Sequence, residues 1–159
     1  MRILLMLVLL VTITSLPVIA GTRADDQRLA VIVHPKTPVA SLSEDELVAI
    51  FTMSQRRWSD GETIVVFNMN PGTSTRVWFD DAVLGMSPDQ AARFWIDRRI
   101  RDGGASPLKT PNAATMLKVV ASLARSIGYI PEAQLGPGVR VVARVINGRV
   151  VPEKKGPAR

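Results

Sequence analysis

The sequence predicts a single α/β domain in which a mixed sheet is flanked by about four helices. Apolar, β-rich runs alternate along the chain with segments whose apolar residues recur at helical spacing, and this alternation is typical of α/β folds. Most helical segments also begin at a recognisable cap and end at glycine or proline. Of the 159 residues, residues 21–148 form the predicted domain, which is long enough for a real core but too short for two lobes of ordinary size.

The first half of the domain predicts two strands and two helices. Residues 29–33, Leu-Ala-Val-Ile-Val, form an apolar run that ends where prolines follow. Ser43 and Glu46 make a capping box, so a helix begins there. Residues 63–67, Thr-Ile-Val-Val-Phe, predict the next strand, and a Pro-Gly turn separates it from a helix that Gly85 closes.

The polar loop at residues 52–61, between the first helix and the second strand, contains two adjacent arginines, Arg56 and Arg57. An unpaired buried charge is costly, so we expect both guanidinium groups to stay in water. Trp58 is expected to fold back onto the domain.

The second half predicts two more helices and two more strands. Ser87-Pro88-Asp89-Gln90 combines a capping box with proline at the first helical position. A glycine-bearing loop at 102–107 precedes a helix that starts at Thr110-Pro111 and has apolar residues at close helical spacing. Strands are expected at 127–130 and 139–146, the latter ending in an Asn147-Gly148 turn.

The first 20 residues have the features of a secretory signal peptide. A short basic start precedes an apolar run, and Pro17 and small residues follow, so cleavage is expected after Ala20 or Ala24. An uncleaved anchor is the alternative, because residues 3–20 could nearly cross a bilayer. We expect cleavage, which would leave a soluble periplasmic or secreted protein.

The charge and cysteine content agree with an exported protein that meets anions. The net charge is +6, and it is +5 without Arg2 of the signal segment. Such an excess attracts nucleic acid, anionic lipid or anionic solutes, and export makes nucleic acid the least favoured partner. Residues 149–159 are basic and contain proline and glycine, which predicts a flexible tail. The absence of cysteine excludes disulfides and a lipidated cysteine.

The main candidate site is the segment Gly72-Thr73-Ser74-Thr75-Arg76, where the strand at 63–67 gives way to a helix. A helix N-terminus presents unpaired N–H groups and the positive end of the helix dipole. The three hydroxyls add short donors, and Arg76 supplies a charge one step inside the helix. Phosphate, sulfate or a carboxylate would fit such a site. The alternative is that Thr73 or Ser74 only caps the helix.

Several short motifs occur in a fixed order between residues 29 and 131. They are Val31-Ile32-Val33-His34-Pro35, Leu42-Ser43, Ile50-Phe51, Trp58, Asp60-Gly61, the segment 72–76, Phe79, Trp95, Gly103-Gly104, Pro107 and Ile127-Gly128-Tyr129. This series resembles the periplasmic phosphate-binding proteins of ABC uptake systems, and in particular a short, one-lobed group related to them. The resemblance implies a single periplasmic-binding-protein-like lobe, a hinge-like strand at 29–33 and a phosphate-facing helix start at 72–76.

The loop before the helix differs from the phosphate-binding pattern. Phosphate-binding members read R-x-D-G-S-G-T here, and Met69 and Pro71 stand at the places of the arginine and the aspartate. Two functions therefore remain open. The first is an exported solute-binding module that holds phosphate or a similar small oxyanion at residues 72–76 and works with a transporter permease. The second is a ligand-free interaction module that keeps the fold and docks to a transporter, sensor or envelope protein.

Nothing in the sequence points to an enzyme, a cofactor or a metal site. His34 is the only histidine, and no G-x-S-x-G elbow supplies an activated serine. One histidine and no cysteine leave only scattered carboxylates for a metal. Trp58, Trp78 and Trp95 could line a ligand groove, but for Trp78 and Trp95 we favour packing in the core.

Overall fold

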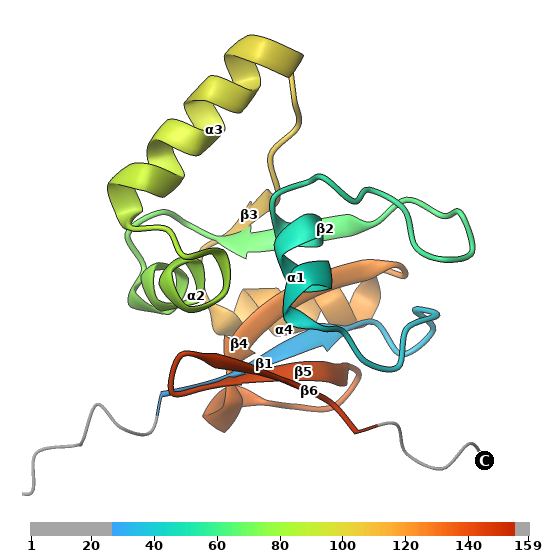
Figure 1. The fold of residues 1–159 in the computed structure, drawn as a ribbon. Coiled ribbons are helices and arrows are strands. Elements are labelled where there is room, and N and C mark those ends of the chain that lie inside the picture. The colour runs from blue at the N-terminus through green and yellow to red at the C-terminus, as the bar shows by residue number, and fades with distance from the viewer. Residues whose placement is uncertain (1–26, 155–159) are drawn as a thin grey trace, which may run out of the picture.

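The computed structural model describes residues 27–154, which form one six-stranded mixed sheet with helices on both faces (Figure 1). The strand order is β3-β2-β4-β1-β5-β6. The strands are β1 (Arg28–Val33), β2 (Val65–Met69), β3 (Leu108–Thr110), β4 (Ser126–Pro131), β5 (Arg140–Ile146) and β6 (Arg149–Pro152). The helices are α1 (Glu44–Phe51), α2 (Ser74–Leu84), α3 (Pro88–Asp102) and α4 (Ala113–Ser122), and a 3₁₀ turn occupies Glu132–Gln134. The predicted α/β class and the number of helices are confirmed.

The sheet is mixed because its strands pair in parallel on one side and antiparallel on the other. β2 pairs in parallel with both β3 and β4, whereas β1 pairs antiparallel with β4 and β5, and β6 adds an antiparallel hairpin strand. β1 and β4 lie at the centre and are buried along almost their whole length. Such near-continuous apolar strands are expected where helices cover both faces of a sheet.

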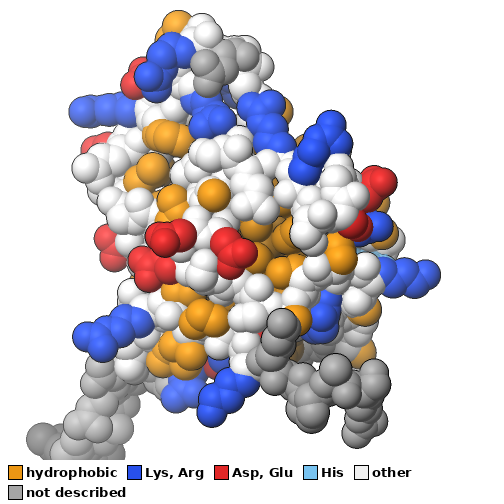
Figure 2. Space-filling view, turned by 45° about the vertical axis from the view of Figure 1, so that its right-hand side comes forward, with side chains coloured by type: hydrophobic (Ala, Val, Ile, Leu, Met, Phe, Trp, Pro, Cys, Tyr) orange, Lys and Arg blue, Asp and Glu red, His pale blue; other side chains and the backbone are white. Residues whose placement is uncertain are grey.

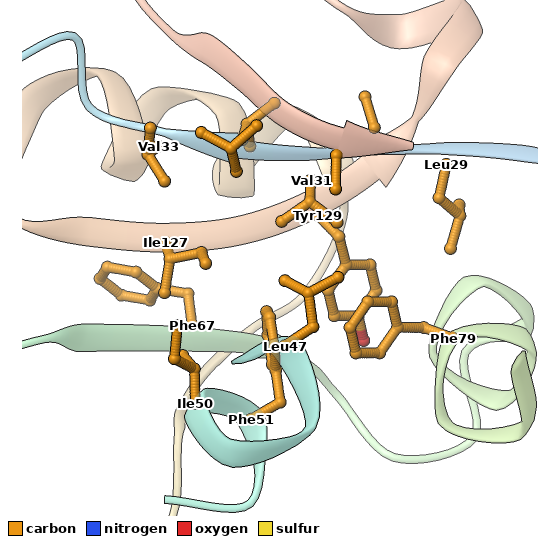
Figure 3. Packing of buried hydrophobic residues seen from close by; sticks show 14 of the residues in the cluster. Leu29, Val31, Val33, Leu47, Ile50, Phe51, Phe67, Phe79, Ile127 and Tyr129 are labelled. Carbon is orange, nitrogen blue, oxygen red and sulfur yellow. The ribbon is translucent and has the colours of Figure 1, made fainter. Parts of the chain in front are cut away.

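The two faces of β4 pack against different helices. Ile127 and Tyr129 point toward α1 and α2, as Figure 3 shows for the side chains around Phe79. Gly128, which lies between them in the strand, faces α4 on the opposite side of the sheet. α4 packs so closely there that a Cβ at this position would collide with Met116. Successive side chains of a strand point to opposite faces, so the Tyr129 ring packs on one face of β4 while α4 packs closely against Gly128 on the other.

The predicted helix signals of α1, α2 and α3 are confirmed. Ser43 and Ser87 both form capping boxes, with Glu46 and Gln90 respectively. Gly85 ends α2 in the left-handed conformation with φ +62°. Side-chain oxygens and αL glycines satisfy backbone groups that a helix end leaves open, so these local signals fix the helix boundaries.

The structure differs from the sequence prediction most clearly at β2, β3 and α4. β2 continues through Asn68 to Met69, because β3 pairs beside it, and the loop expected at 102–107 leads directly into this short strand. α4 begins at Ala113 rather than at Thr110, because the Asn112 side chain caps it by accepting from the Thr115 N–H at 2.9 Å.

The C-terminal boundary of the domain requires a correction. Residues 149–159 were predicted as a flexible tail, but Arg149–Pro152 forms β6, which pairs with β5 across an Asn147-Gly148 turn. Both turn residues have positive φ, as the favoured two-residue hairpin turn requires. The rest of the predicted tail from residue 155, and the predicted signal segment 1–20, lie outside the described residues.

The loop after α1 has the predicted arrangement. Arg56 and Arg57 are exposed and donate hydrogen bonds to nearby carbonyls, while Trp58 is buried. The Trp58 Nε1–H donates to the Arg125 carbonyl at 3.0 Å, which fixes the loop against β4. Among residues 27–154, no helix has the length and apolar composition needed to cross a membrane.

Candidate functional site at the start of helix α2

A tight turn carries the chain from β2 into α2. The Asn70 N–H donates to the Thr110 carbonyl of β3 at 2.9 Å, and the Asn70 carbonyl accepts from both the N–H and the hydroxyl of Thr73. Gly72 has φ +83°, a conformation that side chains other than glycine rarely adopt. The parallel pairing of β2 with β3 therefore holds this turn, and with it the start of α2, in one position.

The first turn of α2 keeps its backbone donors open. Thr73 is the N-cap residue, but its side chain makes no capping hydrogen bond, because the hydroxyl donates backward to Asn70. Within residues 27–154, the N–H groups of Ser74, Thr75 and Arg76 have no hydrogen-bond partner. A side-chain cap at Thr73 or Ser74, the alternative interpretation of this segment, is therefore not formed.

Four of the five predicted site residues divide between two hollows. Ser74 and Thr75 line a groove of about 610 Å³, which we call the α2–β1 groove. Its lining is completed by Gln27, Arg28, Leu29, Trp78, Pro131, Glu132 and Ala133. Gly72 and Arg76 line a different hollow of about 160 Å³, the α2–α3 cavity. Thr73 lines neither of them.

Arg76 does not occupy the position that its expected role needs. Its guanidinium is buried, with Nε 3.0 Å from Asp80 Oδ2 and one terminal nitrogen 3.0 Å from the Met69 carbonyl. These bonds direct the charge into the domain and away from the α2–β1 groove. The sequence does contain a sign of this pairing, because Arg76 and Asp80 are four residues apart on a helix.

A buried polar cluster surrounds the Arg76–Asp80 pair. Burial raises the pKa of Asp80 more than the Arg76 charge and hydrogen bond lower it. Burial likewise raises the pKa of Tyr129, whose hydroxyl donates to Asn68 Oδ1. The Tyr129 ring stacks on Phe79 with centroids 3.8 Å apart, as Figure 3 shows. Sequence reasoning missed this cluster because its members come from three separate elements.

Two charged residues of the α2–β1 groove were also missed from the sequence. Arg28 begins β1, and Glu132 follows the end of β4, where Leu29 and Pro131 pair across the strands. Glu132 accepts from Arg144 at 2.7 Å, and Arg144 also pairs with Glu153. The Glu132 carboxylate is therefore paired with the adjacent strand β5, and Arg28 is a second charged residue in the lining of the groove.

The tryptophans and the histidine have specific places. Trp78 and Trp95 are half-buried, and they line the α2–β1 groove and the α2–α3 cavity respectively. Trp78 also packs against the hydrophobic core, as the sequence favoured, whereas Trp95 does not belong to the core cluster, so the preference is corrected at Trp95 alone. His34 accepts the Lys36 N–H through Nδ1 at 3.1 Å. In the described part of the chain, no three acidic, histidine or cysteine side chains gather as a metal site.

Comparison with known proteins identifies the fold. No protein-family profile and no curated protein sequence matches the chain. Solved structures do match. An ABC-type phosphate transport receptor from Vibrio cholerae has a TM-score of 0.59 and 18% identity, with 73% of this chain and 45% of the other covered.

Two further structures give similar values. A protein described as a phosphate ABC transporter substrate-binding protein, with bound phosphate, from Clostridium perfringens has a TM-score of 0.58 and 19% identity, covering 72% of this chain and 44% of its own. PstS from Borrelia burgdorferi has a TM-score of 0.57 and 14% identity, covering 84% and 51%. The chain thus spans about half the length of these proteins. It has the fold of a single periplasmic-binding-protein-like lobe.

Proposed function

We propose that this protein is an exported solute-binding module that holds phosphate or a similar small oxyanion in the α2–β1 groove. The observation that carries the proposal is the open first turn of α2, where three backbone N–H groups lack partners beside the hydroxyls of Ser74 and Thr75. Backbone donors and the helix dipole together favour a bound anion. Arg28 also lines this groove, whereas Arg76, the cation expected at the site, is bonded to Asp80 and Met69.

Binding by this single lobe is expected to be weak. Arg76 is bonded to Asp80 and Met69, so the ligand meets backbone N–H groups, two hydroxyls and one groove cation. A few such hydrogen bonds correspond to micromolar to millimolar affinity, or about 4 to 8 kcal/mol. A half-exposed ion pair is screened by salt, so the affinity should fall as ionic strength rises.

We also propose a partner and a location for the protein, the partner from its structural similarity to transport proteins and the location from its apolar start. The neighbouring structures are described as phosphate transport receptors and substrate-binding proteins, and this supports a transporter permease as partner and a non-enzymatic role. The apolar start of the sequence supports export and cleavage of residues 1–20, which would place the mature protein in the periplasm or outside the cell. Mass spectrometry of the exported protein tests this, and a membrane-bound product that retains residues 1–20 would contradict it.

Calorimetric titration of phosphate and sulfate at matched ionic strength tests the oxyanion site. The sharpest variant is Ser74→Pro, because proline is tolerated at the first helical position but lacks both the N–H and the hydroxyl. Ser74→Pro and the pair Ser74→Ala with Thr75→Ala should each weaken binding at least severalfold. Ser122→Ala, whose hydroxyl contacts only the carbonyl of Val119 in its own helix, is the matched control and should bind as wild type does.

The outcomes separate the two functions that the sequence left open. Equal binding by wild type and Ser74→Pro would place the anion elsewhere. No binding by wild type would favour an interaction module that docks to a transporter, sensor or envelope protein. One observation supports that second function: Ile96 and Ile100 of α3 are 58% and 77% exposed, on a helix that projects from the body of the domain (Figure 1).

A further inference from the structure

The α2–α3 cavity is a preformed hollow that the oxyanion proposal does not use. α3 stands off from the sheet (Figure 1). Arg98 bridges it to the loop after α1 by donating to the Met53 carbonyl at 3.0 Å. A capping box and Pro88 fix the start of α3, and Gly103 with φ +58° ends it. These contacts hold the helix in place above a cavity of about 160 Å³.

The walls of the cavity are apolar and its floor is polar. The apolar lining residues are Pro71, Val77, Pro88, Ala91, Ala92, Trp95 and Pro107. Three buried polar residues, Asn68, Arg76 and Asp80, also line it. Gly72, the half-buried Ser106, Arg99 and Lys109 complete the lining, and the two cations are exposed, so they mark its mouth.

The floor presents a hydrogen-bond acceptor and a donor that the protein itself leaves unused. Asp80 is only 4% exposed, and its Oδ1 has no partner among residues 27–154, although Oδ2 is bonded to Arg76. The Asn68 oxygen accepts from Tyr129, and the Asn68 amide nitrogen makes no hydrogen bond within the described chain. A buried acceptor without a partner is costly, which indicates that a donor from outside the protein completes this floor.

The size and polarity of the cavity define the ligand class. A protein cavity of about 150 Å³ can hold benzene, so this one has room for one ring. A hydroxyl both donates and accepts, and it can therefore satisfy Asp80 and Asn68 together. The two cations at the mouth favour a carboxylate at the opposite end of the ring.

We propose that the α2–α3 cavity binds a small aromatic carboxylate that has a hydroxyl group opposite its carboxylate. The hydroxyl donates to Asp80 Oδ1 and accepts from the Asn68 amide, the ring lies among the apolar walls beside Trp95, and the carboxylate faces Arg99 and Lys109. This site is separate from the α2–β1 groove and does not depend on oxyanion binding there.

Calorimetry with three probes tests the polarity of the site. 4-Hydroxybenzoate should bind in the micromolar to millimolar range, whereas benzoate, which lacks the hydroxyl, and phenol, which lacks the carboxylate, should each bind at least fivefold more weakly. This ratio is an order-of-magnitude expectation, because a site built for a hydroxyl rejects the analogue that leaves buried groups unpaired. Equal affinity for all three probes, or no binding at millimolar concentration, would overturn the proposal.

Two sets of variants locate the binding. Ala92→Phe places a ring over the cavity from an exposed position of α3 and should abolish 4-hydroxybenzoate binding. Ala114→Phe, at an exposed position of α4, is the matched control and should bind normally. The double change Arg99→Gln with Lys109→Gln should weaken 4-hydroxybenzoate but leave phenol unchanged.

The same variants distinguish this proposal from the oxyanion site. Ala92→Phe should leave phosphate binding unchanged, and Ser74→Pro should leave 4-hydroxybenzoate binding unchanged. If Ala92→Phe folds with the wild-type melting temperature and still binds 4-hydroxybenzoate, the ligand is elsewhere. If Ala92→Phe does not fold, the double variant at the mouth decides the question, and an unaltered affinity for 4-hydroxybenzoate there contradicts the proposal.

Discussion

The buried pair of Arg76 and Asp80 allows a sharp comparison between two substitutions at Asp80. At an effective dielectric constant near 20, their attraction is about 4 to 5 kcal/mol at hydrogen-bond distance, and removing each ion from water costs several kcal/mol. Burial outweighs Arg76 in setting the pKa of Asp80, so ionised Asp80 gains little net free energy from the pair. Asp80→Asn keeps an acceptor for Arg76 and should lower the free energy of unfolding by less than about 2 kcal/mol.

Asp80→Ala should have a much larger effect. It removes the acceptor and leaves the buried guanidinium with one carbonyl partner, Met69, at a cost of about 3 to 5 kcal/mol. In a domain of this size such a loss lowers the melting temperature on the order of 10 to 20 °C. Urea unfolding followed by tryptophan fluorescence measures both variants. If Asp80→Asn is as destabilising as Asp80→Ala, the charge attraction dominates and the reasoning is wrong.

The pH dependence of stability in wild type and Asp80→Asn tests the balance between burial of Asp80 and its attraction to Arg76. The folded pKa of Asp80 is raised above its ordinary value of 3.8, so the folded protein binds the proton more tightly than the unfolded chain does. The stability that Asp80 contributes is therefore fully present below 3.8 and is lost as pH rises through the higher folded pKa. The stability of wild type relative to Asp80→Asn should fall over this window. A relative stability that rises with pH would show that Arg76 outweighs burial and holds the pKa of Asp80 below 3.8.

Three further expectations test other parts of the fold. Tyr129 is the only tyrosine, so tyrosinate absorbance should be absent from the folded protein a full pH unit above its ordinary pKa of 10 and should appear only on unfolding; early absorbance would show that its hydroxyl is accessible. Gly128→Ala should cost about 1 to 3 kcal/mol through overpacking against Met116, and in urea unfolding the double change with Met116→Ala should cost less than the sum of the two single changes, whereas additive costs would place the strain elsewhere. Arg56→Ser with Arg57→Ser should leave the melting temperature nearly unchanged, and a large decrease would reveal an ion pair.

The elements that the sequence predicted well are those with strong local signals. The capping boxes at Ser43 and Ser87 define helix starts because the side chain and the backbone satisfy one another within four residues. Gly85 similarly determines its own helix end. β3 has only three residues and no periodicity to detect, and its formation depends on the parallel edge that β2 offers. The basic residues, proline and glycine of segment 149–159 predicted a flexible tail, so the sequence did not reveal that its first residues pair with β5 as β6.

The sequence predicted the backbone conformation of the candidate site but not the positions of the charged side chains around it. The strand-turn-helix arrangement at Gly72 followed from local turn chemistry, and the open N–H groups of α2 followed from helix geometry. The direction of Arg76 could not follow from either of these, because it depends on Asp80 and on the depth to which α2 packs against the sheet. Arg28 and Glu132 are more than 100 residues apart in the sequence and reach one groove only through the pairing of β1 with β4.

The position of Arg76 and Asp80 gives the two proposed sites beside α2 different chemical environments. The resemblance puts an arginine and an aspartate in the turn before the helix, and this chain has Met69 and Pro71 there. Its own arginine and aspartate, Arg76 and Asp80, stand within α2 and line the α2–α3 cavity. The start of α2 is therefore left with dipole and backbone donors, which suit a weakly held and salt-sensitive oxyanion. The charges and the unpartnered carboxylate oxygen lie in the cavity, where low solvent exposure strengthens each hydrogen bond and favours a ligand that matches them in position.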